Sequence, residues 1–487
     1  MKEDWIECCF EDLLDYEQPT KYIVKSTKYN DSYKMPVLTA GKTFIKGYTN
    51  ETDGVFENLP TIIFDDFTTA TQFVNFKFKV KSSAMKILVP TSKLVNMPLV
   101  YYAMQVNQVR SDTHKRYWIS VFAKKKFLLP PLVEQKAIVK RIEELFSSLD
   151  SGIADLKKAQ DQLVIYRQAV LKEAFAGELT KEWREKQTNL TTADKLLEQI
   201  KEERQKHYET QVSNWKLAVK VWEKSDKTGK KPSRISKPKE FSSVKLEEIE
   251  NYDSIPNSWF WTRFGTVTYK IGDIDHKMPK TVEKGMPYVS TGNIGKNGKI
   301  DFHNAKQISR QDFDRLALKI KPEKGDIIFP RYGTIGRNIL IDYYKEFLVS
   351  YSCAIIKNIT KVMDEKFALY YSLSPVIKRE INRYVVETTQ ANIGIASIES
   401  FVYPLCSKEE QHQIVLEIES RLSVCDKVEE SINESLQKSI ALRQSILKKA
   451  FDGTLLNKEE IAQCKQHKDY EPSSILLEKI KAEKKQK

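Results

Sequence analysis

The chain contains one segment twice, 276 positions apart. Residues 134–179 match residues 410–455 without a gap, beginning with Glu134 and its counterpart Glu410. A repeat of this length means that one structural unit occurs twice, which rules out folds with a single unrepeated core. At 487 residues the chain is also too long for one core. We therefore expect at least two domains that share one plan.

Each copy of the repeat predicts a long helix. Apolar residues follow one another at steps of three, four or seven, and no proline interrupts either copy. Both copies end at Ala-Phe-x-Gly, where Gly177 or Gly453 suits a helix C-cap. From Glu134 to Ala176 such a helix is about 65 Å long.

A long helix with one apolar stripe needs a partner. Its own duplicate is the nearest candidate, and the alternative is that each stripe packs on its neighbouring domain. We expect the stripe to form the helix and subunit interface, with the following residues in it: Ile142, Leu149, Leu156, Ile418, Cys425 and Ile432.

The segments before the helices repeat more faintly. Short β-branched and aromatic runs broken by Gly, Asn and Asp predict mixed α/β modules with several short strands. The expected fold class is α+β with an internal pseudo-two-fold duplication. Three landmarks recur in the same order: Met35–Gly41 with Met286–Gly292, Ile62–Phe64 with Ile327–Phe329, and Tyr101–Tyr102 with Tyr370–Tyr371.

The duplication divides the chain into five regions. The stretch Lys224–Lys239 is polar, basic and proline-containing, which indicates a flexible connector within the third region. The regions are a first module at 1–133, a first helical region at 134–206, a basic linker at 207–250, a second module at 251–409 and a second helical region at 410–487.

The basic excess lies outside the helical regions. The net charge is +13, to which residues 1–133 contribute 18 basic against 14 acidic residues and residues 251–409 contribute 23 against 17. This excess fits a polyanion partner, and it equally fits mere solubility. Both interpretations remain open at this point.

Metal, membrane and disulfide chemistry have little support. The six cysteines form no C-x-x-C pair and the six histidines show no ligand spacing, so we expect reduced structural thiols, no metal and no cofactor. The N-terminus lacks the order of a signal peptide, and no apolar run is long enough to span a bilayer. We therefore expect a cytoplasmic protein without a membrane partner.

Four motifs make the chain resemble a known family, the specificity subunits of type I restriction–modification systems. They are Pro130–Gln135 with its following helix, Ile255–Trp259, Gly325–Phe329 and Gln390–Gly394. The resemblance covers nearly the whole chain. The first module departs from the pattern, since it has Leu59–Phe64 where a Gly-Asp turn is expected and His114–Trp118 in place of the Asn-Ile-Gly segment.

The resemblance implies a fold, a function and partners. In that family two target-recognition domains each read half of a split DNA site, and two long helices pair antiparallel as a spacer between them. The helices dock methyltransferase subunits, and a motor-nuclease restriction subunit joins for cleavage. The chain would then be a DNA-recognition subunit without catalytic activity of its own.

Loops that combine cations, side-chain donors and small residues are the candidates for DNA contact. Arginine pairs bidentately with guanine and asparagine with adenine, while hydroxyl groups hold phosphate. For each loop the alternative is a solvated turn. The candidates are Lys42, Thr43, Lys46, Tyr48, Lys115, Arg116, Arg331, Tyr332, Thr334, Arg337, Asn338, Gln390 and Asn392.

Signatures of catalysis are missing from the sequence. No Asn/Asp-Pro-Pro-aromatic tetrad of a DNA methyltransferase occurs, and the glycines of Gly292–Lys299 do not fit a phosphate-binding P-loop. Two rival hypotheses remain: a coiled-coil scaffold whose modules bind protein, and an enzyme that acts alone. The salt dependence of binding to duplex DNA separates the first rival from DNA recognition.

Overall fold

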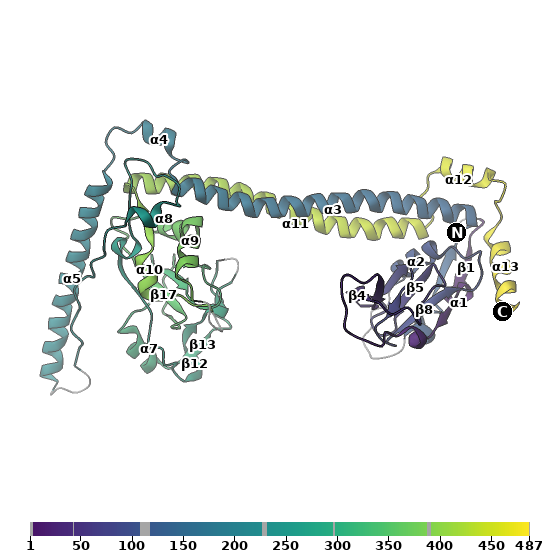
Figure 1. Ribbon diagram of the computed structural model, residues 1–487, viewed down its shortest axis with the longest axis horizontal. Coiled ribbons are helices and arrows are strands. Elements are labelled where there is room, and N and C mark those ends of the chain that lie inside the picture. Colours follow the sequence, from purple (N-terminus) through teal and green to yellow (C-terminus); the bar gives the residue numbers. More distant parts are fainter. Residues whose placement is uncertain are drawn as a thin grey trace. The chain divides into compact units, whose positions relative to one another are not determined.

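A computed structural model describes residues 3–41, 43–107, 117–225, 231–295, 298–386 and 391–486. The chain forms two compact units, one of Met1–Ala159 with Ser431–Lys487 and one of Gln160–Glu430. Each unit holds one globular domain together with parts of both long helices (Figure 1). Across the described ranges, no helix is long and apolar enough to cross a membrane.

The first domain is built on small antiparallel and mixed sheets. Its sheets have the strand orders β2-β8-β5-β6, β4-β3-β7 and β1-β9. Ile62, Ile63 and Phe64 of the central strand are completely buried, as their uninterrupted apolar run predicts. The strands are β1 (Ile6–Cys9), β2 (Leu14–Glu17), β3 (Met35–Leu38), β4 (Ile45–Thr49), β5 (Thr61–Asp65), β6 (Thr71–Val74), β7 (Lys79–Val80), β8 (Met85–Pro90) and β9 (Lys126–Leu129), and the helices are α1 (Phe10–Leu13) and α2 (Met97–Val106).

The second domain repeats this topology strand for strand. Its sheets are β11-β17-β14-β15, β13-β12-β16 and β10-β18, so every described strand of the first domain has a counterpart. The predicted duplication and the α+β class are confirmed. The strands are β10 (Phe260–Arg263), β11 (Thr268–Gly272), β12 (Thr281–Val289), β13 (Lys306–Ile308), β14 (Ile327–Pro330), β15 (Ile339–Leu340), β16 (Leu348–Val349), β17 (Cys353–Asn358) and β18 (Val402–Leu405), and the helices are α7 (Arg310–Ala317), α8 (Glu365–Leu373), α9 (Pro375–Tyr384) and α10 (Ile395–Ser400).

The two predicted long helices are present. They are α3 (Leu132–Phe175) and α11 (Lys408–Phe451), and each begins two residues before the repeated segment. Gly177 and Gly453 adopt φ of 78° and 70°, a region that glycine enters without steric cost. The amide after each glycine bonds the carbonyl five residues earlier, at 3.0 Å and 2.8 Å, so both helices end in the same C-cap motif.

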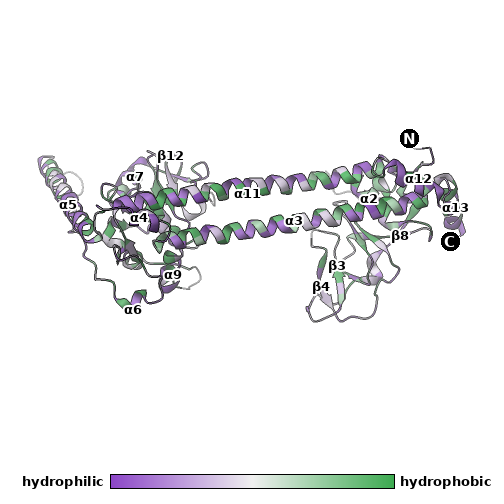
Figure 2. Cartoon of the chain, turned by 90° about the horizontal axis from the view of Figure 1, so that it is seen from above, coloured by the Kyte–Doolittle hydropathy of each residue, from purple (hydrophilic) through white to green (hydrophobic). Residues whose placement is uncertain are grey.

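Within each unit the two helices pair with opposite directions. Arg167 near the end of α3 binds Asp426 and Glu429 at 2.7 Å and 2.9 Å in one unit, and Arg443 near the end of α11 binds Asp150 in the other. The repeat makes Arg443 the counterpart of Arg167 and Asp150 the counterpart of Asp426. Each unit therefore holds the two helices together by the same kind of ion pair. Figure 2 shows hydrophobic and hydrophilic residues alternating along both helices.

The helices also pack on the domains, so the alternative prediction holds as well. Ile142 and Ile418 are completely buried in the cores of the first and second domain. Cys425 and Ile432 are also buried, whereas Leu149 and Leu156 are half-buried. The burial of these four side chains shows that they pack within this chain, and their part in recruiting a partner subunit stays a prediction.

The same buried contact joins each domain to the helix that follows it. The indole of Trp5 donates to Glu134 at 2.9 Å, and that of Trp259 donates to Glu410 at 2.8 Å. Both carboxylates stand in the first turn of a long helix, where the helix dipole favours negative charge. The matched Glu-Gln pairs of the sequence thus mark a structural junction.

The predicted basic linker is in part a helix. After the short helix α4 (Lys181–Glu185), α5 runs from Ala193 to Lys224 and so covers the first part of the range 207–250. Its beginning packs on the second domain through Leu196 and Ile200. In the first unit α12 (Lys458–Gln466) precedes α13 (Ser473–Gln486), which packs on the first domain through Leu476 and Ile480. Residues 226–230 of the predicted connector lie outside the described residues.

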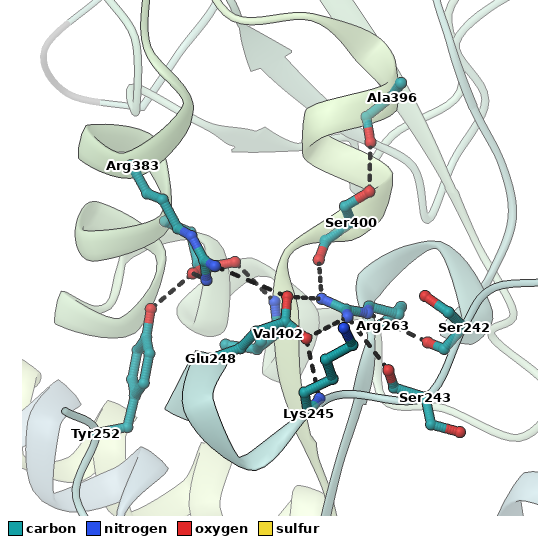
Figure 3. A network of polar contacts seen from close by, with 11 residues as sticks. Ser242, Ser243, Lys245, Glu248, Tyr252, Arg263, Arg383, Ala396, Ser400 and Val402 are labelled. Carbon is teal, nitrogen blue, oxygen red and sulfur yellow. Dashed lines mark hydrogen bonds and ion pairs between the residues drawn. The ribbon is translucent and has the colours of Figure 1, made fainter. Parts of the chain in front are cut away.

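The end of the linker is anchored to the second domain (Figure 3). Arg263 binds Glu248 of α6 (Leu246–Ile249) at 2.6 Å and donates to the carbonyl groups of Ser242, Ser243 and Ser400. The hydrogen bond from Arg263 holds the pKa of Glu248 below its usual range.

A buried carboxylate completes this anchor. Glu380 is completely buried and accepts from the Tyr252 hydroxyl at 2.7 Å and from the Val402 amide at 2.9 Å. Residues 242–252 are therefore part of the second domain and not free linker.

Candidate nucleic-acid interface

Two loops of the second domain that the sequence singled out lie together. The loop 331–338 connects β14 to β15, and the segment 391–393 follows α9. The Gly333 amide donates to the Ala391 carbonyl at 3.1 Å, and the Ile393 amide donates to the Arg331 carbonyl at 3.0 Å. Tyr332 also forms an isolated β-bridge with Asn392. The fold thus joins segments about sixty residues apart into one surface.

The exposed members of this surface suit contact with DNA. Arg337 is exposed, while Tyr332, Thr334 and Asn392 are half-buried. Arginine and asparagine donors can read base edges, and a half-buried tyrosine can pack against sugar or base. Gln390 lies outside the described residues.

Arg331 and Asn338 do not fit the role that the sequence predicted for them. Arg331 is 4% exposed, and its guanidinium binds Asp273 at 2.5 Å and the Tyr351 and Ile393 carbonyl groups at 3.0 Å and 3.3 Å. Asn338 is buried and donates to the Ser372 carbonyl at 2.7 Å. Both side chains are occupied inside the domain, so we withdraw them from the set of base-contacting candidates.

In the first domain the candidates lie on the β3–β4 hairpin. Thr43 and Lys46 are exposed and Tyr48 is half-buried. The Thr39 hydroxyl donates to the Thr43 carbonyl at 2.6 Å, and this hydrogen bond stabilises the turn between the two strands. Lys42, Lys115 and Arg116 lie outside the described residues.

The duplicated topology adds candidates that sequence reasoning missed. Because β12–β13 is the counterpart of β3–β4, the second domain has its own hairpin, with an open groove lined by Lys284, His303 and Lys306 among others. Because β5–β6 is the counterpart of β14–β15, the loop 66–70 with exposed Phe67 corresponds to the loop 331–338. The Ile-Ile-Phe run that precedes both loops in the sequence was the signal from which the loop 66–70 could have been predicted as a candidate.

The structure gives no sign of a metal centre in the parts of the chain that it describes. Among the described residues, no cluster of three or more His, Cys, Asp or Glu side chains could hold a metal ion. The six cysteines are free thiols in this structure, and five of them are buried. Burial raises the pKa of Cys353, on the strand next to β14, to about 12, so this thiol stays protonated near neutral pH.

Three comparisons place the chain among known proteins. Residues 2–158 and 265–438 match the family described as type I restriction modification DNA specificity domain. The chain is 45% identical over 175 residues to the specificity subunit of the type I restriction enzyme EcoR124I/EcoR124II from Escherichia coli, covering 33% of this chain and 43% of that protein. It is 26% identical over 356 residues to the EcoBI specificity subunit from Escherichia coli, covering 73% of this chain and 64% of that protein.

The matched regions therefore span less than two thirds of the length of these two relatives. A solved chain from work on complex assembly and conformational transition of the type I R-M system has the same fold. It superposes with a TM-score of 0.57 at 14% identity, covering 93% of this chain and 99% of that chain.

Proposed function

Because the chain belongs to the type I restriction modification DNA specificity domain family, we propose that it is the DNA-recognition subunit of a type I restriction–modification complex. Each domain reads one half of a bipartite site. The chain recruits methyltransferase and restriction subunits, which supply the catalysis, and it has no catalytic activity itself. It acts in the cytoplasm, where such a complex meets the chromosome.

One observation carries the proposal. Both domains have the same strands in the same order, yet the loops 66–70 and 331–338 at corresponding positions differ in length and side chains. Two domains that recognise different base sequences need the same strands to hold their loops, and loops that differ in their side chains. The basic excess of both domains supports attraction to a polyanion.

The first test is DNA binding by the assembled complex. The chain is co-produced with the methyltransferase subunit of its own system, and the methylated motif is mapped in cells. A motif of two half-sites around a gap is expected, and its affinity should fall linearly on a logarithmic scale as salt rises. Absence of binding to duplex DNA would favour the protein-binding scaffold.

The second test addresses the loop 331–338. Arg337→Ala should weaken binding of the mapped site by about 1–3 kcal/mol if Arg337 reads a base. Arg310→Ala is the matched control, since Arg310 is an exposed arginine of the same domain that pairs with Asp314 and Glu346. Equal binding by both variants would remove Arg337 from the interface.

A further inference from the structure

The residue directly after the central strand of each domain links a loop of the candidate interface to a second segment of the same domain. Asp66 follows β5 and Arg331 follows β14. The Tyr117 amide donates to the Asp66 carbonyl at 3.1 Å, and the Ile393 amide donates to the Arg331 carbonyl at 3.0 Å. The same main-chain bond thus recurs in both domains.

The side chains of these two residues reinforce that link with opposite chemistry. The carboxylate of Asp66 accepts from the Trp118 amide at 2.9 Å. The guanidinium of Arg331 donates to the Ile393 carbonyl at 3.3 Å and to the Tyr351 carbonyl at 3.0 Å. An acid binds backbone N–H groups and a guanidinium binds backbone carbonyl groups, so side chains of opposite charge make the same connection.

Both side chains are buried, and both have an ionic partner. Asp66 and Arg331 are 5% and 4% exposed. Lys86 lies 3.9 Å from Asp66, and Asp273 lies 2.5 Å from Arg331. A buried ion pair adds little net stability compared with an apolar pair of similar volume, because both charges lose their hydration. Because Asp66 and Arg331 also bond Trp118 and Ile393 of a second segment, their burial points to a role in loop geometry.

We infer that Asp66 and Arg331 are positioning residues for DNA recognition, each fixing the loops of its own domain and so the specificity for one half-site only. The inference rests on the proposed function. Neither residue contacts DNA; each acts through the loops that it joins. Loss of one should relax recognition of one half-site while the other half-site stays fully required.

The test in the second domain separates loop geometry from stability. The double variant Arg331→Gln with Asp273→Asn replaces the ion pair by a neutral pair, which avoids an unpaired buried charge. Binding of the complex is measured to the mapped site and to sites with one base changed in either half. Discrimination should fall about tenfold in one half-site and stay unchanged in the other. Arg310→Ala is the control for an arginine lost elsewhere in this domain.

The first domain gives an independent test with a conservative variant. Both Asp66→Asn and Asp66→Ala remove the carboxylate beside buried Lys86, but Asp66→Asn keeps an acceptor for the Trp118 amide and Asp66→Ala does not. Asp66→Asn should keep discrimination within about twofold of the parent, and Asp66→Ala should lose about tenfold in the half-site that the second-domain variant leaves intact. Glu57→Ala, which removes an exposed carboxylate paired with Lys77, is the control.

The outcomes separate the inference from the function on which it rests. If the parent complex shows no bipartite motif, the proposed function itself fails. If the parent shows one but the variants keep full discrimination, or lose it equally in both half-sites, Asp66 and Arg331 are not positioning residues. Should the double variant unfold at a lower temperature than the parent, the pair Asp66→Asn and Asp66→Ala decides. Both variants lose the charge beside Lys86 and differ in the acceptor for the Trp118 amide, and their discrimination is compared at a temperature where both are fully folded.

Discussion

The two domains agree where they join the helices and differ where their loops meet. At the helix junction the indole–carboxylate bond of Trp5 and Glu134 is repeated by Trp259 and Glu410. After the central strand the two domains carry side chains of opposite charge. The junction is constrained because both domains use the same pair of helices. The loops are free to diverge because each would face different bases.

The largest predicted effect compares the two junction carboxylates. Glu410 binds Arg184 at 2.7 Å, whereas the corresponding neighbour of Glu134 is the neutral hydroxyl of Tyr470 at 3.4 Å. Glu410→Ala leaves a mostly buried cation without its partner and should cost about 3–5 kcal/mol of unfolding free energy. Glu134→Ala leaves only neutral donors and should cost about 1–3 kcal/mol. Urea unfolding of both variants measures the difference, and equal losses would mean that Arg184 contributes nothing at the junction.

The next prediction concerns acid stability and the anchor of the second domain. Because the pKa of Glu248 is lowered by Arg263, its contribution is present above pH about 4.5 and is lost as the pH falls through the lowered value. Glu248→Gln should cost about 1–2 kcal/mol at pH 7, and the difference from the parent should vanish in acid.

The first domain offers the contrast to this anchor. Cys9 occupies the position that corresponds to Arg263, and its thiol donates to the Lys124 carbonyl as Arg263 donates to the Ser400 carbonyl. Burial raises the pKa of Cys9, so no charge is lost there in acid. Hydrogen exchange at neutral pH and at a series of falling pH values should therefore show acid opening at residues 242–252 and not at Cys9. A pH-independent difference between Glu248→Gln and the parent would contradict the assignment.

The smallest effect is expected at the reciprocal helix pairs. Arg167→Ala loses two partly exposed carboxylate partners, whereas Arg443→Ala loses one carboxylate and a contact over the Phe146 ring at 4.2 Å. Each should cost about 0.5–1 kcal/mol. The two should respond differently to salt, since screening weakens the ion pairs more than the ring contact. If salt at about three times physiological ionic strength reduces both effects equally, the ring contact is not what distinguishes the two pairs.

Much of the fold could be predicted because its signals are local or repeated. The helix stripe, the glycine C-caps at Gly177 and Gly453 and the buried run Ile62–Phe64 depend on neighbours within a few positions along the chain. The repeat added long-range information, since matched residues must occupy matched places. The structure of the linker was predicted less well, because the polar, basic composition of residues 207–224 was interpreted as a linker although these residues belong to helix α5.

The candidate site could be predicted only in part. From the sequence, Arg331 and Arg337 were equally good candidates for DNA contact, because both are arginines of one loop, six positions apart. The tertiary structure distinguishes them, because Asp273, directly after β11, binds the buried guanidinium of Arg331, while Arg337 is exposed to solvent.

The sequence by itself determined that there are two copies of one plan, two long helices and a shared frame, because periodicity and repetition are properties of the chain. Only the tertiary structure decided which charged residues face solvent and which hold loops together. Burial depends on what packs against a side chain from elsewhere, and a linear pattern carries no record of that.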